Sequence, residues 1–259
     1  MATLTEQNFE KIFTDSVTEV GLLFVDYEAE MNEILSEALF NDISKKKING
    51  YMELAVISAL AVDKDISKYI RDRIADSYKF GFEFSNEILG KSKYNDDNKA
   101  QVSALADEAI IDFRAGIQGV TAKTERVMLD TLVQQIKAKL GRAPKALIDY
   151  RDISEDVLKQ FGKNGVTGFI TKNGKNMPLK WYAETLTRTH ITKAANDAII
   201  SNAIKSGKTR VKVSSHPGAC HICIPYQGKV YDVLGRDGLD TPPPMPIHPN
   251  CKHLLIPLG

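Results

Sequence analysis

The sequence predicts an α+β protein that is mostly α-helical, with a bundle-like helical domain over residues 1–145 and a small α+β domain over residues 146–259. Three observations lead to this prediction. All ten prolines lie from Pro144 onward, so the preceding part of the chain is free to form long helices. Apolar residues recur in that part at helical spacing. All three cysteines lie near the other end of the chain, where their spacing is that of metal ligands.

The helical part carries five apolar stripes with a period close to 3.6 residues, which predict four to six helices packed antiparallel. Two polar segments, residues 45–50 and 90–98, are rich in Lys, Asn, Asp and Gly and predict breaks between helices. The last stripe ends at Gly141, beside cations that suit the C-terminus of a helix. The stripes are those that include Phe9 and Val17, Ile34 and Leu39, Ile66 and Ile74, Val102 and Ile117, and Leu129 and Leu140.

Residues 146–259 show short segments of both helical and strand type instead of long helical stripes. Residues 150–163 are typical of one short helix, and residues 167–177 predict a β-hairpin that turns at Asn173-Gly174. A helix is expected from Pro178 to about Ser206, where Gly207 would end it. Two short strands should follow, over residues 209–214 and 229–233. The Pro-rich run 241–246 is interpreted as an extended connector.

Four residues predict a closed structural zinc site: Cys220, Cys223, His248 and Cys251. A Cys-x2-Cys pair can bind one ion from a tight turn, and the His-x2-Cys pair would complete a tetrahedron. Two alternatives stay open. The thiols could be buried without a metal, or the ion could keep an open catalytic position near His216, His221 and His253. We favour the structural site because four protein ligands leave no place for a substrate water.

Composition and charge say less about the function than the cysteine and histidine spacing does. The chain has 259 residues, of which 43% are hydrophobic and 26% charged, as in ordinary globular proteins. No apolar run approaches the roughly 20 residues that span a bilayer, so neither secretion nor membrane insertion is expected. Residues 146–259 hold 15 Lys and Arg against 9 Asp and Glu, whereas the rest of the chain is acidic. This asymmetry is compatible with contact between the second part and a polyanion.

The predicted helix after Pro178 is rich in short polar side chains. Arg188 and Asn196 lie about two turns apart on nearly one face, and with Glu184 and His190 they could line a buried polar seam. We expect Arg188 to bond carbonyls or an acid of its own domain rather than a phosphate. The sequence contains no phosphate-binding loop, no Gly-x-Ser-x-Gly and no His-Glu-x-x-His motif.

A series of short motifs over about residues 164–257 resembles the minor capsid, or head morphogenesis, proteins of tailed bacteriophages, the group similar to the F protein of phage Mu. The order of the motifs makes the resemblance specific, although position 252 is Lys where relatives commonly have Arg. The residues that carry it are the run 182–189 with Arg188, then Asn196, the run 211–219, Cys223, the run 227–231 with Gln227, Gly228 and Lys229, and the run 248–253 with Asn250 and Lys252.

This resemblance implies a non-enzymatic virion protein in the capsid interior near the portal vertex, present in the host cytoplasm during assembly. It implies roles in head morphogenesis and in DNA packaging or ejection. The implied partners are the portal protein and, in addition, scaffolding or major capsid protein. The helical domain would dock to these proteins. DNA would be contacted through its phosphates without sequence readout. Two other functions stay open: a metal-dependent nuclease or hydrolase at the Cys/His cluster, and a stand-alone zinc module that binds DNA.

Overall fold

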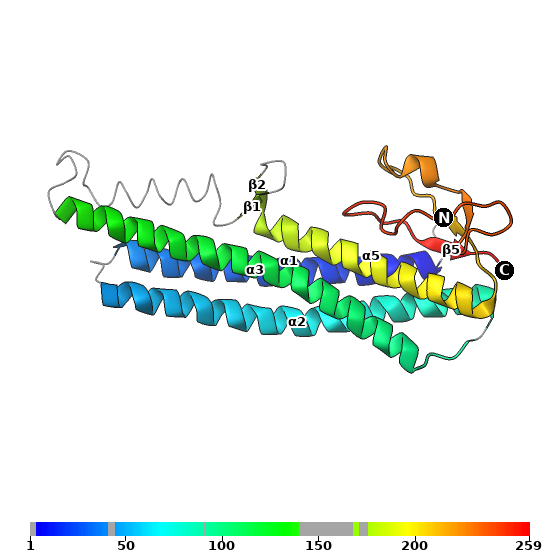
Figure 1. Cartoon of the computed structure of the whole chain (residues 1–259), viewed down its shortest axis with the longest axis horizontal. Helices are drawn as coiled ribbons and strands as arrows, with labels where there is room; N and C mark the ends of the chain where they lie inside the picture. The colour runs from blue at the N-terminus through cyan, green and yellow to red at the C-terminus, as the bar shows by residue number, and fades with distance from the viewer. Residues whose placement is uncertain (1–3, 41–44, 91, 140–167, 171–175) are drawn as a thin grey trace. The chain divides into compact units, whose positions relative to one another are not determined.

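The computed structural model describes residues 4–40, 45–90, 92–139, 168–170 and 176–259 (Figure 1). These ranges are mostly helical and include a small antiparallel sheet, as the sequence predicts. The helices are α1 (Leu4–Phe40), α2 (Lys45–Leu89), α3 (Asp96–Lys139) and α5 (Leu179–Ser206), with a short 3-10 helix at Ile224–Tyr226. The strands are β1 (Gly168–Ile170), β2 (Asn176–Pro178), β3 (Arg210–Val213), β4 (Val230–Asp232) and β5 (Leu255–Pro257). None of the described helices contains a stretch long and apolar enough to cross a membrane.

Among the described residues of the first half there are three helices rather than the expected four to six, and the predicted break at 45–50 is displaced, since α1 already ends at Phe40. Helix α2 begins at Lys45 and continues through Gly50, whose position has open space around it. One glycine in a helix costs about 1 kcal/mol, which does not end a helix of 45 residues. The predicted break after Gly90 is confirmed, since Gly90 has φ 101° and α3 begins at Asp96.

Helix α3 starts with a reciprocal cap. The amide of Asn98 donates to the side-chain oxygen of Asn95 at 3.3 Å, and the amide of Asn95 donates to that of Asn98 at 3.1 Å. Each side chain thus satisfies a backbone N–H that the first turn leaves without a helical partner. Asp96 and Asp97 follow in the first turn, where the positive end of the helix dipole favours them.

The second half largely follows the prediction. The antiparallel pair β1–β2 corresponds to the expected hairpin, whose turn residues lie outside the described ranges, as does the short helix expected over 150–163. Helix α5 and strands β3 and β4 lie where they were expected, and β5 was missed. In the sheet β4–β3–β5, the central strand pairs antiparallel with both neighbours, so that Val211 faces Tyr231 on one side and Pro257 on the other.

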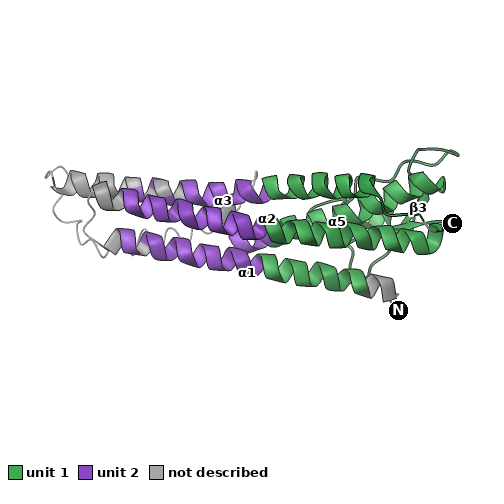
Figure 2. Ribbon diagram, turned by 90° about the horizontal axis from the view of Figure 1, so that it is seen from below, with its two compact units in different colours: residues 1–20, 67–111, 184–259 green, residues 21–66, 112–183 purple. Residues whose placement is uncertain are grey.

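The chain divides into two compact units, each built from distant segments (Figure 2). Unit 1 contains residues 1–20, 67–111 and 184–259, and unit 2 contains residues 21–66 and 112–183. The C-terminal sheet and loops therefore share a unit with parts of α1, α2 and α3. The predicted domain boundary between residues 145 and 146 lies outside the described ranges and stays a prediction.

Unit 2 is held by aromatic packing and by a few buried hydroxyl bonds. The rings of Phe24 and Phe113 lie 5.9 Å apart and are fully buried. The hydroxyl of Tyr27, also buried, is 2.9 Å from that of Thr121. Tyr182 donates from its hydroxyl to the carbonyl of Asp112 at 3.1 Å, which fixes the start of α5 on α3 within this unit. Burial of such aromatic side chains contributes about 1.5–3 kcal/mol each.

Unit 1 has two adjoining apolar clusters that position α5. The first cluster joins α1, α2, α5 and the segment before β5, and the second lies between α5 and the sheet. Gly81 of α2 lies directly against the backbone of Ala195 in α5, so the two helices approach as closely as their backbones permit. The buried members are Phe9, Phe13, Phe80, Ile191, Ala195 and Leu254 in the first cluster, and Ile199, Val211, Val213, Tyr231, Met245 and Leu255 in the second.

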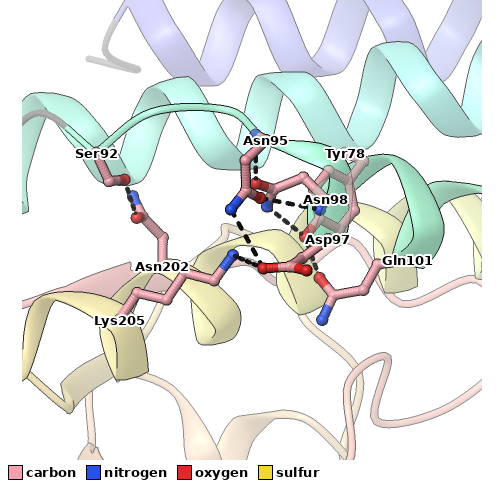
Figure 3. Close-up of polar contacts among 8 residues, drawn as sticks. All are labelled: Tyr78, Ser92, Asn95, Asp97, Asn98, Gln101, Asn202 and Lys205. Atoms are coloured by element: carbon pink, nitrogen blue, oxygen red, sulfur yellow. Dashed lines mark hydrogen bonds and ion pairs between the residues drawn. The ribbon is translucent and has the colours of Figure 1, made fainter.

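A polar network within unit 1 joins α5 to the end of α2 and to the connection between α2 and α3 (Figure 3). The amide of Asn202 donates to Ser85 at 2.8 Å and to Asn86 at 2.9 Å, and its oxygen accepts from Ser92. Figure 3 shows Ser92 and Asn202 facing each other, while Lys205 reaches Asp97 at 4.0 Å. Because buried polar groups cost energy unless each is paired, this network fixes one register of α5 against the α2–α3 connection.

The contact between Gly81 and Ala195 predicts opposite effects for two Gly→Ala substitutions in α2. A methyl group at position 81 would collide with the carbonyl of Ala195, so Gly81→Ala should lower the free energy of unfolding by about 1–3 kcal/mol. Gly50→Ala, with no atom within 4 Å, should raise it by about 0.5–1 kcal/mol. Urea denaturation of both variants measures the difference, and a loss of stability no larger for Gly81→Ala than for Gly50→Ala would contradict the close packing.

Candidate metal centre

Two tight turns bring the thiols and a histidine ring together. After β3, the amides of Cys223 and Ile224 both donate to the carbonyl of Cys220 at 3.0 Å, which folds the Cys-x2-Cys segment into a turn. Before β5, the amide of Cys251 donates to the carbonyl of His248, also at 3.0 Å. Each turn places its first and last side chains close together, so each can offer two ligands to one ion.

The four predicted ligands and His253 form one cluster. The Nε2 atom of His248 lies 3.1 Å from the sulfur of Cys220 and 3.0 Å from that of Cys223. The sulfurs of Cys223 and Cys251 are 3.8 Å apart, and Nδ1 of His253 is 3.4 Å from the sulfur of Cys251. The donors thus make two overlapping triads that share Cys223, each with all donor atoms within 4.8 Å of one another. This cluster could hold a metal ion.

The donor types are those found in zinc sites, but the four predicted ligands are divided between the two triads, with Cys251 grouped with Cys223 and His253 rather than with Cys220 and His248. With Zn–S bonds of about 2.3 Å, two sulfurs on a tetrahedron lie about 3.8 Å apart, and a sulfur and an imidazole nitrogen slightly less. The separation of Cys223 from Cys251 has this value, and the two contacts of His248 are somewhat shorter. Three sulfurs and one imidazole are also the ligand types that zinc prefers over the harder cations.

The two histidines differ in the partner of their second ring nitrogen. Nδ1 of His248 lies 2.6 Å from the carbonyl of Pro249, which leaves Nε2 to face the sulfurs. A metal-bound histidine almost always donates its other N–H in this way. His253 is 3% exposed and its Nε2 has no partner among the described residues, while its Nδ1 faces the sulfur of Cys251. His248 thus has the ring support that a metal-bound histidine usually has, whereas Nδ1 of His253 faces the sulfur of Cys251 within the second triad.

Burial and hydrogen bonds shift the pKa values of the titrating groups in the cluster in different directions. Burial, together with the facing Cys251, raises the pKa of the Cys223 thiol, so this thiolate is disfavoured without a counter-charge. Backbone N–H bonds from the turn lower the pKa of the Cys220 thiol. Burial, with His216 and His248 nearby, lowers the pKa of His253 to about 4 and keeps its ring neutral. A divalent ion would stabilise the deprotonated sulfurs that the protein alone penalises.

The two remaining histidines of the predicted group belong to neither triad, although His216 contacts a member of one. The ring of His216 stacks edge-on against His253 at 4.9 Å, and its Nε2 lies 2.9 Å from the hydroxyl of Ser214. The backbone amide of His216 also donates to the side-chain oxygen of Gln227 at 2.6 Å. His221 is exposed in the Cys-x2-Cys turn and belongs to neither triad.

The motif residues of α5 hold the loops that carry the ligands. Asn196 is fully buried, donates to the carbonyl of His253 at 3.1 Å and accepts from the amide of Leu255 at 2.7 Å. Arg188 lies 3.6 Å from Glu184 and donates to the side chain of Asn250 at 3.2 Å. The expectation that Arg188 bonds an acid of its own surroundings is thus confirmed for Glu184.

The other motif residues also form contacts within, or next to, the loops that carry the candidate ligands. Gly228 adopts φ 71°, which suits glycine, and its amide donates to the carbonyl of Val213 at 2.9 Å. The carbonyl of Lys229 accepts from the amide of Val213 at 3.1 Å, while its side chain is exposed. Lys252 lies 3.0 Å from Glu10 and 5.4 Å from the ring centre of Phe13, which ties the second ligand turn to α1.

Sequence reasoning missed two hydroxyl residues that contact the loops. The hydroxyl of Thr192 donates to the carbonyl of Cys251 at 3.0 Å, and that of Ser214 accepts from the amide of Leu254 at 3.0 Å. The unusual richness of α5 in short polar side chains is the signal that could have found Thr192. Ser214 carries no comparable signal, because its role depends on how β3 lies beside the segment before β5.

Comparison with known proteins extends the resemblance seen in the motifs. A family model described as phage minor capsid protein 2 matches residues 26–243, which include most of the helical part. A curated relative named structural protein, from Lactococcus phage LL-H, is 28% identical over an alignment of 116 positions that covers 39% of this chain. The alignment covers 31% of the relative, so the chain spans about a third of its length. No solved structure matches.

The buried amide of Asn196 predicts a large effect on stability. Asn196→Ala would leave the carbonyl of His253 and the amide of Leu255 without their buried partner, and should lower the free energy of unfolding by about 2–4 kcal/mol. Asn95→Ala, which removes an exposed cap of α3, is the control and should cost about 1 kcal/mol. Equal losses for the two variants in urea denaturation would contradict the anchoring role of Asn196.

Proposed function

This chain belongs to the phage minor capsid protein 2 family, and from that premise we propose that it is a minor component of the virion that acts in head morphogenesis near the portal vertex. The observation that carries the proposal is the extent of the family match, which runs from residue 26 to residue 243. It takes in α2, α3 and α5 whole, together with the first ligand turn. A role that needs both the helices and the C-terminal loops is therefore supported better than one confined to the loops.

The two parts of the chain suit different neighbours. The long helices offer extended surfaces for the portal protein, and for scaffolding or major capsid protein, inside the capsid. Residues 146–259 have an excess of Lys and Arg, which would meet DNA through its phosphates during packaging or ejection. Such contacts need no sequence readout and weaken as salt is added. Assembly with these partners would take place in the host cytoplasm.

The cluster of Cys220, Cys223, His248 and Cys251 would hold a structural zinc ion. When bound, the ion supplies a cross-link between two loops and a positive charge for the thiolates. The strands beside these loops have only three or four residues each, so the sheet has few ladder bonds with which to fix them. The loops gain order from the ion, and the surface that they present gains a fixed shape.

The geometry favours this structural role over a nuclease or hydrolase at the same cluster. Cys223 and Cys251 are each 1% exposed and the ring of His253 is buried beside them. A catalytic ion needs an open position that solvent and substrate can reach. His221 is exposed but lies outside both triads, and His216 faces Ser214 and His253. We therefore infer a non-enzymatic protein.

Metal analysis tests the zinc site. Protein purified without chelator should carry about one equivalent of zinc. Cys223→Ser should fall below about half an equivalent, and chelation should lower the melting temperature because the ion stabilises only the folded loops. His221→Ala, an exposed position outside both triads, is the matched control and should keep its zinc. Wild-type protein below half an equivalent, with no change in Cys223→Ser, would refute the site.

Co-purification tests the role in assembly. Tagged protein expressed during infection with the phage that encodes it should purify with portal protein and with procapsids. Incubation of the same protein with plasmid and divalent metal should leave the DNA uncut. Protein that stays apart from portal and procapsids would refute the assembly role. Plasmid cleavage that disappears in His253→Ala would instead support the nuclease alternative.

A further inference from the structure

Asn250 has an unusual backbone at the centre of the second ligand turn. Its φ is 67°, in the left-handed region that side chains other than glycine rarely adopt, although Asn tolerates it better than most. The turn runs from His248 through Pro249 and Asn250 to Cys251, and is closed by the bond from the Cys251 amide to the His248 carbonyl. Pro at the second position and a positive φ at the third are the features of a type II turn.

The first and last residues of this turn, His248 and Cys251, are two of the candidate ligands of the ion. Because a type II turn brings its first and fourth residues within 7 Å, the backbone of Asn250 decides whether His248 and Cys251 can meet Cys220 and Cys223. A residue that resists a positive φ would open the turn or store strain in it.

The side chain of Asn250 locks the same turn onto α5. Its oxygen accepts from Arg188 at 3.2 Å and its nitrogen donates to the hydroxyl of Thr185 at 3.3 Å. Arg188 is itself steadied by Glu184 one turn earlier. The hydroxyl of Thr192 holds the next carbonyl of the loop, that of Cys251. Residues 185, 188 and 192 lie on one face of the helix, so one helical surface contacts the turn at both of its last residues.

We propose that Asn250 is a positioning residue for the metal centre, which sets His248 and Cys251 in place through its left-handed backbone and its two side-chain bonds to α5. This inference rests on the proposed zinc site. These contacts would restrict the turn without the ion, so zinc binding would have to supply less of the free energy of ordering the loops. Losing such support around a metal ligand typically lowers metal affinity by about 10- to 100-fold.

Three substitutions separate the backbone from the side chain. Asn250→Ala removes the side-chain bonds and disfavours the left-handed backbone, and should weaken zinc binding about tenfold or more. Asn250→Gly keeps the backbone free but removes the bonds, and should fall between Asn250→Ala and wild type. Asn250→Asp tolerates the same φ and keeps an acceptor for Arg188, so it should stay within about threefold of wild type.

Asp237 offers a matched control. It is the other residue besides glycine with a positive φ in the described ranges, at 55°, and it lies early in the segment between β4 and β5, where its carboxylate pairs with Arg210 of β3 at 2.8 Å rather than with the cluster. Asp237→Ala therefore imposes the same kind of backbone strain away from the cluster and should leave zinc affinity unchanged. If Asn250→Ala does not fold, Thr185→Val, which keeps the shape of the side chain and removes one bond to Asn250, takes its place with an expected loss of about threefold.

The experiment measures zinc affinity by competition with a chelating dye, and the absorption spectrum of the cobalt-substituted protein, for each variant. The expected spectrum stays that of a tetrahedral ion with three sulfurs, because Asn250 is not a ligand. Asn250→Ala that binds zinc within twofold of wild type would overturn the inference while leaving the site intact, as would an equal loss in Asp237→Ala. Wild-type protein that binds no zinc would overturn the proposed site and the inference together.

Discussion

The buried polar face of α5 is the constraint on which the C-terminal structure depends. Backbone groups removed from water must find partners, and the segment from Cys251 to Leu255 enters the regular ladder only at its end. Two side chains of the helix supply those partners. Asn196 donates to the carbonyl of His253 and accepts from the amide of Leu255, and Thr192 donates to the carbonyl of Cys251. The position of α5 thereby determines the path of the loop, and with it where Cys251 and His253 lie.

The charges of the thiols and imidazole rings concern this loop and the rest of the candidate site together. Three cysteine thiols and two histidine rings crowd together without a carboxylate or a cationic side chain among them, and burial disfavours the charged form of Cys223 and of His253. A divalent ion in this cluster would reverse that penalty for the thiols and would join the turn after β3 to the turn before β5. Such a cross-link would act on the same backbone as the anchors of α5, since Thr192 bonds the carbonyl of Cys251.

The elements that could be predicted are those whose signal is local. The apolar stripes, the Gly90 break, the span of α5 and the strands β3 and β4 follow from spacing and turn residues within a few positions. The break predicted at residues 45–50 is displaced because the cost of one glycine is small against a long helix. Strand β5 escaped because it has three residues and contains Pro257, which is tolerated at the edge of the sheet, where β5 lies.

The sequence by itself determined the mostly helical class and the spacing of the four candidate ligands. Only the tertiary structure decided that residues 184–259 pack with parts of α1, α2 and α3, and that α5 supplies the anchors of the ligand turn. It also decided that His253 joins the cluster and that His248 has the better-supported ring. The reason is physical: ligand spacing and turn chemistry act between near neighbours in the chain, whereas burial and hydrogen-bond partners depend on which distant segments meet.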